Sequence, residues 1–167
     1  SANMIDVDLI ETLQFAIETI RPDAKDKSLK LIWDAPAPIK MRGDKHRLQK
    51  LFLNLLSNAV TFNKDGGAVK LSVQTIKGKA VIVDIIDTGI GIPKDAMEAI
   101  FEPFVQVDKG YSREYDGVGL GLSVAKQMLD LHKGRMTINS AVGKGAHIRI
   151  ALPIFTERQD DPPSIAA

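Results

Sequence analysis

The sequence of 167 residues predicts an α/β two-layer sandwich, in which a mixed, roughly five-stranded sheet carries three main helices on one face. Three observations predict it. Apolar residues recur at helical spacing in three long stretches, and β-branched or alternating stretches lie between them. Short turn signals such as Lys77–Gly78 join neighbouring extended stretches into antiparallel hairpins. The length suits one domain with a core of its own.

In the first half of the chain, acidic residues mark the expected helix starts. The expected elements are a helix over 8–20, a strand over 29–33, a loop over 35–38 and a helix over about 44–62. Asp8 and Asp44 precede the two helical patterns and suit the N-cap position. Arg21–Pro22 is expected to end the first helix, because proline lacks the N–H that a helix interior needs.

In the second half, strands come in pairs around one more helix. The expected elements are strands over 68–75 and 80–86, a short helix over 94–100, an irregular stretch over 101–116, a helix over about 119–132, and strands over 135–140 and 146–152. The domain is expected to cover residues 6–154. Residues 1–5 are interpreted as a leader or cloning remnant, and residues 155–167 as a flexible, polar and Pro-rich tail.

The composition excludes several classes of protein. A net charge of +1 gives no strong attraction to nucleic acid, so no nucleic-acid partner is expected. The absence of cysteine excludes disulfide and thiolate chemistry. No apolar run approaches the roughly 20 residues of a membrane span. We expect a cytoplasmic domain, whose parent protein can still be anchored in a membrane elsewhere.

The stretch Asp87–Pro93 follows a β-branched run that reads as a buried strand. Its two glycines allow close backbone approach, and Asp87 supplies a fixed acceptor, a combination that favours a ligand contact. The alternative for Asp87 is a turn aspartate that bonds to nearby backbone. The triplet Asp87–Gly89 also occurs in aspartic proteases, but three long helices argue against that mostly β class.

A second glycine set, Gly117–Leu122, runs into a helical pattern. Backbone N–H groups ahead of a helix N-terminus favour phosphate. The set matches neither the Walker form, which needs Gly-Lys-Ser/Thr, nor the dinucleotide fingerprint, which needs a glycine in place of Leu122. A flexible hinge is the alternative interpretation.

Asn54 and Asn58 lie one helical turn apart and share a face. Asn58 either bridges backbone inside the fold or uses its amide oxygen as a ligand of Mg²⁺, a hard ion that prefers oxygen. No carboxylate cage is visible in the sequence, which suits an ion held mostly by a triphosphate.

Four segments together resemble, in order and spacing, the N, G1, F and G2 boxes of bacterial sensor histidine kinases. They are Asn54–Ala59, Asp87–Ile92, Phe101–Phe104 and Gly117–Leu122. The resemblance spans about residues 40–153 and places the chain in the superfamily of gyrase, heat-shock chaperone and mismatch-repair ATPases. It implies the Bergerat-type ATP-binding fold and the cofactors ATP and Mg²⁺.

The resemblance also implies roles for single residues. Asp87 would accept a hydrogen bond from the adenine amino group, and Asn58 would bind Mg²⁺; Asn54 and Asn58 are the candidate catalytic residues. Residues 105–116 resemble the lid over ATP. The implied nucleotide contacts are Phe62, Asp87, Gly89, Gly91, Ile92, Lys109, Arg113, Gly117, Val118, Gly119, Leu120, Gly121 and Leu122.

Two departures from the family pattern leave an alternative open. Thr61 stands where many members have a lysine, so a cation facing the phosphates is missing unless the lid or Lys126 supplies it. Ala146 stands where a Thr or Ser often helps to bind adenine. They favour a degenerate, nucleotide-sensing pseudokinase or scaffold module as the alternative to a kinase. A third reading, an ATPase clamp relative, is opposed by Asn54, because the ATPases have a glutamate general base there.

The resemblance implies transfer of the γ-phosphoryl group to a histidine, for relay to the receiver domain of a response regulator. The acceptor is expected on an upstream dimerisation domain absent from this chain, because none of the three histidines here precedes an acidic residue. The full-length protein is expected to be a homodimer and this fragment a monomer. Alone, it should bind ATP and transfer little.

Overall fold

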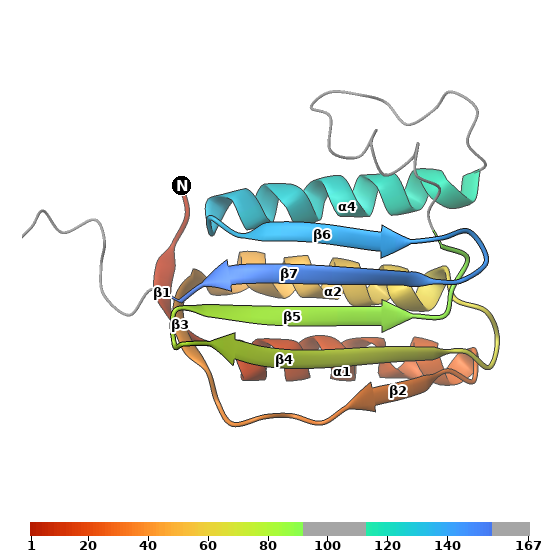
Figure 1. Cartoon of the computed structure of the whole chain (residues 1–167), viewed down its shortest axis with the longest axis horizontal. Helices are drawn as coiled ribbons and strands as arrows, with labels where there is room; N and C mark the ends of the chain where they lie inside the picture. Colours follow the sequence, from red (N-terminus) through yellow and green to blue (C-terminus); the bar gives the residue numbers. More distant parts are fainter. Residues whose placement is uncertain (92–112, 155–167) are drawn as a thin grey trace, which may run out of the picture.

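The computed structural model describes residues 1–91 and 113–154, the side chains of residues 113–121 excepted. In these ranges, three helices cover one face of a five-stranded sheet of order β2-β4-β5-β7-β6 (Figure 1). Strand β2 is parallel to β4 and the other neighbours are antiparallel. The sheet contains β2 (Lys30–Trp33), β4 (Ala68–Ile76), β5 (Ala80–Asp87), β6 (Arg135–Ser140) and β7 (Ala146–Pro153), and the helices are α1 (Leu9–Asp26), α2 (Lys45–Thr61) and α4 (Arg113–Leu131). The predicted fold class is confirmed.

Both predicted helix caps are confirmed. Asp8 Oδ1 accepts a hydrogen bond from the Ile10 N–H at 3.0 Å, and Asp44 Oδ1 accepts one from the Arg47 N–H at 3.2 Å. The first N–H groups of a helix have no partner within the helix, so each cap stabilises its helix by about 1 kcal/mol. The cap at Asp44 fixes the start of α2, the helix that carries Asn58.

The predicted end of α1 at Arg21–Pro22 is wrong, because the helix continues through Pro22 to Asp26. The next turn buries Ala24, which is 1% exposed, and the Ala24 carbonyl accepts a hydrogen bond from Leu29 at 2.9 Å. The apolar stripe of α1 thus extends past the proline, and its burial offsets the hydrogen bond that proline removes.

A second sheet of two antiparallel strands, β1 (Met4–Asp8) and β3 (Lys40–Asp44), was not predicted. It lies at one end of the main sheet (Figure 1). Val7 and Met41 are its buried apolar side chains, and so few apolar positions give no clear alternation in the sequence. Strand β1 begins at Met4, within the segment interpreted as a leader.

The predicted hairpin of β4 and β5 closes with a type I′ turn. Lys77 and Gly78 have φ of 51° and 65°, and the Lys79 N–H donates to the Ile76 carbonyl at 2.9 Å. The register places this turn and Asp87 at opposite ends of β5.

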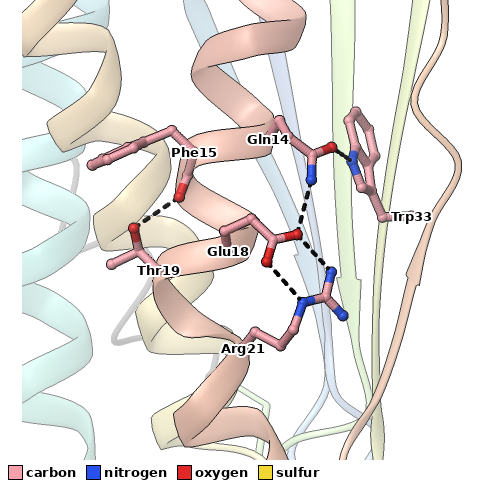
Figure 2. A network of polar contacts seen from close by, with 6 residues as sticks. All are labelled: Gln14, Phe15, Glu18, Thr19, Arg21 and Trp33. Carbon is pink, nitrogen blue, oxygen red and sulfur yellow. Dashed lines mark hydrogen bonds and ion pairs between the residues drawn. The ribbon is translucent and has the colours of Figure 1, made fainter.

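A polar chain ties edge strand β2 to helix α1 (Figure 2). Trp33 Nε1 donates to Gln14 Oε1 at 2.7 Å, and Gln14 Nε2 donates to Glu18 Oε1 at 2.9 Å. Arg21 completes the chain with two hydrogen bonds to the Glu18 carboxylate. The parallel pair β2–β4 is short, so this contact adds a fixed point at the edge of the sheet.

Asp84 lies on the outer face of the sheet, away from the helices. Its neighbours Val83 and Ile85 face the core and are 0% exposed. Arg149 Nε donates to Asp84 Oδ1 at 2.8 Å, and His147 Nε2 lies 2.7 Å from the same oxygen. Burial raises the pKa of Asp84, but the hydrogen bonds from Arg149 and His147 outweigh it and hold the pKa below its ordinary 3.8.

The change Asp84→Asn is expected to lower stability at pH 7. Because the folded-state pKa lies below the unfolded value, the carboxylate contributes stability above that value and loses it as the pH falls through the folded pKa. Thermal melts of both proteins should therefore differ at pH 7 and converge as the pH falls below the folded-state pKa of Asp84. A difference independent of pH would contradict the ion pairing.

Candidate functional site

The loop Asp87–Gly91 follows β5 and lies against the end of helix α2. Asp87 Oδ1 accepts a hydrogen bond from the Gly89 N–H at 2.8 Å, and the Phe62 carbonyl accepts one from Ile90 at 3.0 Å. A Cβ on Gly89 would lie 2.5 Å from the Phe62 carbonyl oxygen. The loop can therefore lie this close to α2 only with glycine at position 89.

The turn between β6 and β7 holds the other side of this loop. The Ile90 carbonyl accepts a hydrogen bond from the Gly143 N–H at 2.7 Å. Gly91 has a φ of +73°, and a Cβ there would overlap the Ala141 carbonyl oxygen. Gly145, with a φ of +82°, likewise leaves room for backbone at Asp87. The glycines thus allow backbone-to-backbone contacts within the protein on both sides of the loop.

These contacts enclose a pocket with mostly apolar walls. Its lining residues are Leu55, Asn58, Ala59, Phe62, Asp87, Ile90, Gly91, Leu122, Ala146 and Ile148. Asn58 and Asp87 are the two polar side chains among them, contributed by α2 and by the end of β5. An apolar cavity with a few placed polar groups is the usual form of a small-molecule site.

The pocket brings together five of the predicted site residues, namely Asn58, Phe62, Asp87, Gly91 and Leu122. Sequence reasoning missed Leu55, Ala59, Ile90 and Ile148 as pocket residues. Leu55, Ala59 and Ile90 are apolar positions inside two of the motifs, and Ile148 is one on an alternating strand, which is also the signal of an ordinary core residue.

Asp87 and Asn58 are polar groups in surroundings that disfavour them. Burial raises the pKa of Asp87 above its ordinary 3.8, and the N–H groups of Gly89 and Ala146 offset only part of this. Asn58 Nδ2 is buried and has no hydrogen-bond partner among the described residues. Buried polar atoms normally have partners, so this amide N–H group is a hydrogen-bond donor that the described residues leave unused.

Several predicted site residues cannot be placed in the pocket. Ile92 and Lys109 lie outside the described residues, as does the segment 101–104. Asn54 is half-buried on α2, one turn before Asn58, and does not line the pocket. Lys126, a candidate for the cation missing at Thr61, instead forms an ion pair with Asp130 at 3.2 Å.

Helix α4 begins at Arg113, so the predicted start at about residue 119 is wrong. Arg113, Gly117, Val118, Gly119, Leu120 and Gly121 therefore lie within the helix, and the glycine set does not precede its N-terminus. Residues 113–116 include no proline and are compatible with a helix. The glycines suggested a boundary because each costs a helix about 1 kcal/mol relative to alanine, but this local penalty does not end the helix here.

Lys27 braces the end of α2, directly before the pocket residue Phe62. Its Nζ donates to the carbonyls of Val60 at 3.1 Å, Thr61 at 2.6 Å and Asn63 at 3.1 Å. The last carbonyls of a helix have no partner within the helix and carry its negative dipole end, so a cation is favoured there.

The change Lys27→Met is expected to lower the free energy of unfolding by about 1–2 kcal/mol, because three carbonyls lose a charged donor. Denaturant unfolding measures it. Lys50→Met, at an exposed position in the middle of α2, is the matched control and should change stability little. Equal effects of the two changes would contradict the bracing.

Comparisons with known proteins show the family of this chain. The family model described as histidine kinase-, DNA gyrase B-, and HSP90-like ATPase matches residues 43–156. The circadian input-output histidine kinase CikA of Thermosynechococcus vestitus is 36% identical over 150 residues, which are 88% of this chain. This chain spans 20% of the length of CikA.

Solved structures share the fold. Full-length ShkA in complex with AMPPNP matches with a TM-score of 0.75 and 29% identity, over 94% of this chain and 32% of ShkA. The histidine kinase ThkA, solved in complex with the response regulator protein TrrA, matches with a TM-score of 0.74 and 19% identity, over 93% of this chain and 43% of ThkA. The latter likeness concerns the fold alone. Among the helices that the structure describes, none has the length and apolar composition of a membrane span.

Proposed function

Because this chain belongs to the family of histidine kinase-, DNA gyrase B- and HSP90-like ATPases, we propose that it is the catalytic ATP-binding domain of a two-component sensor histidine kinase. It transfers the γ-phosphoryl group of ATP to a histidine on a separate dimerisation domain. The observation that carries the proposal is the apolar pocket in which the Asp87 carboxylate and the Asn58 amide lie together.

In this proposal, Asp87 recognises the adenine base. Its carboxylate accepts a hydrogen bond from the exocyclic amino group, which replaces part of the solvation lost by burial. The apolar side chains of Phe62, Ile90 and Ile148 cover the base, and Ile92 is expected to join them.

Asn58 suits the Mg²⁺ that accompanies ATP, because its side chain lines the pocket and its amide oxygen is the kind of ligand that this ion prefers. The described residues contain no group of three or more His, Asp or Glu side chains that could hold a metal, so most ligands of the ion would come from phosphate and water. When bound, the ion neutralises phosphate charge. Lys109, Arg113 and the segment Gly117–Leu122 are proposed to hold the phosphates.

Asn54 favours transfer over hydrolysis, because an amide cannot take a proton from water at neutral pH. The reaction then depends on positioning and charge neutralisation. The proposed partners are the dimerisation domain of the parent homodimer and the receiver domain of a response regulator. We propose a cytoplasmic location, because the substrate ATP is found there. The relatives named above lend no support to a degenerate, pseudokinase module.

Calorimetry with Mg²⁺-ATP and Mg²⁺-ADP tests the proposal first, with micromolar affinity as the expected result. Transfer of labelled phosphate to the separately added histidine-bearing domain of the parent protein tests the reaction. Absence of binding at millimolar nucleotide would overturn the proposal. Steady hydrolysis by the isolated domain would contradict the role given to Asn54.

A further inference from the structure

The side chain of Asn63 joins the end of α2 to the loop that carries Asp87. Asn63 is 7% exposed. Its Oδ1 accepts hydrogen bonds from the Thr88 hydroxyl at 3.0 Å and from the Lys64 N–H at 2.9 Å, and its Nδ2 donates to the Ala68 carbonyl at 3.0 Å. One amide thus contacts three separate points of the chain.

Thr88 completes this link, which we call the Asn63–Thr88 brace. Its hydroxyl accepts a hydrogen bond from the Ala68 N–H at 2.9 Å, and its own N–H donates to the Ala68 carbonyl at 3.2 Å. A Cβ on Gly67 would lie 2.5 Å from Asn63 Oδ1, so glycine leaves the space that the brace occupies. The brace therefore has a built position between α2, β4 and the loop.

We infer that Asn63 is a positioning residue for recognition of the base, and that it acts through Thr88 to fix Asp87 against the end of α2. Asn63 is not among the pocket residues. Phe62 on one side of the pocket and Asp87 on the other are, however, the immediate neighbours of Asn63 and Thr88 in the sequence. The identity of the ligand as a nucleotide rests on the proposed function.

An asparagine suits this place because both functions of its amide are used. Threonine offers a single oxygen, and aspartate lacks the N–H that Ala68 accepts.

The selectivity for adenine over guanine follows from the position of the Asp87 carboxylate, since adenine presents an amino group where guanine presents a carbonyl. A fixed carboxylate accepts from the first and repels the second, whereas a displaced carboxylate distinguishes them less well.

Two readouts on Asn63→Ala and Thr88→Val test the inference. Amide hydrogen exchange of Gly89 and Ile90 in the free domain should become at least about 10-fold faster, while the core amides of β5 keep their rates. The ratio of ATP to GTP affinity should fall by about 10-fold, and the double variant should lose little more than either single one. Trp33→Phe is the control, because it removes one side-chain hydrogen bond at the sheet edge.

Unchanged exchange at Gly89 and Ile90 would overturn the inference, and so would additive effects of the two changes. If Asn63→Ala fails to fold, the exposed Thr88→Val change carries the same test. A wild-type domain that binds no nucleotide would overturn the proposed function. The amide exchange rates of Gly89 and Ile90 would still test whether the Asn63–Thr88 brace holds the loop.

Discussion

The change Asp87→Asn is expected to stabilise the free domain and, at the same time, to weaken its binding of ATP. Burial disfavours the ionised form of Asp87, as its raised pKa records. Asparagine has nearly the same shape, keeps an oxygen for the Gly89 N–H and carries no charge. The loss of a charged acceptor for the adenine amino group should reduce affinity by roughly 10- to 100-fold.

Thermal melts and calorimetry on the same two proteins measure both effects. Because the folded-state pKa of Asp87 is raised, protonation contributes stability that is present below the unfolded pKa and is lost as the pH rises through the folded pKa. The advantage of Asp87→Asn should therefore be largest at neutral pH and vanish below about pH 4. Asp84→Asn is the matched control, since its pKa is shifted in the other direction.

Two results would contradict this account. A melting temperature of free Asp87→Asn below that of the wild type would mean that the carboxylate is stabilised in the empty pocket. An unchanged affinity for ATP would mean that Asp87 does not contact the base.

The change His132→Ala is expected to lower the free energy of unfolding by about 3–4 kcal/mol, or roughly 10 °C in melting temperature. His132 is 2% exposed and joins the end of α4 to the start of α2. Its Nε2 accepts a hydrogen bond from the Asp44 N–H at 2.9 Å, so the neutral ring carries its proton on Nδ1, which lies 2.7 Å from the Met128 carbonyl. Alanine leaves a cavity and two backbone groups without partners.

His147→Ala is the control for this prediction. The His147 side chain is 36% exposed and its hydrogen bond to Asp84 lies at the surface, so its removal should cost less. Denaturant unfolding of both variants separates the cases. A His132→Ala domain as stable as His147→Ala would show that the buried ring does not join the two helices.

The parts of the fold that could be predicted are those with a local cause. Asp44 caps α2 by a hydrogen bond to Arg47, only three residues away, and Lys77–Gly78 forms its turn from two adjacent residues. The pairing of β1 with β3 joins residues more than 30 positions apart and has no local pattern. Pro22 shows the reverse case, in which burial of the next turn overrides a local signal.

The candidate site divides in the same way. Asp87 and Asn58 could be predicted because their motifs have a fixed order and spacing. Lys27 and Asn63 could not, because each acts on backbone or side chains brought close only by folding. In the sequence, both are polar residues just after a helix, and a polar residue at such a position gives no signal of a specific contact.

The hairpin turn at Lys77–Gly78 makes the domain convenient for spectroscopy. A Cβ on Gly78 would meet nothing within 4 Å, and Asp87 lies at the far end of β5, about 23 Å from the turn at roughly 3.3 Å per residue. The chain contains no cysteine, so Lys79→Cys would create a single thiol beside this turn. One fluorophore attached there would report nucleotide binding by energy transfer to a labelled ATP, without touching the pocket.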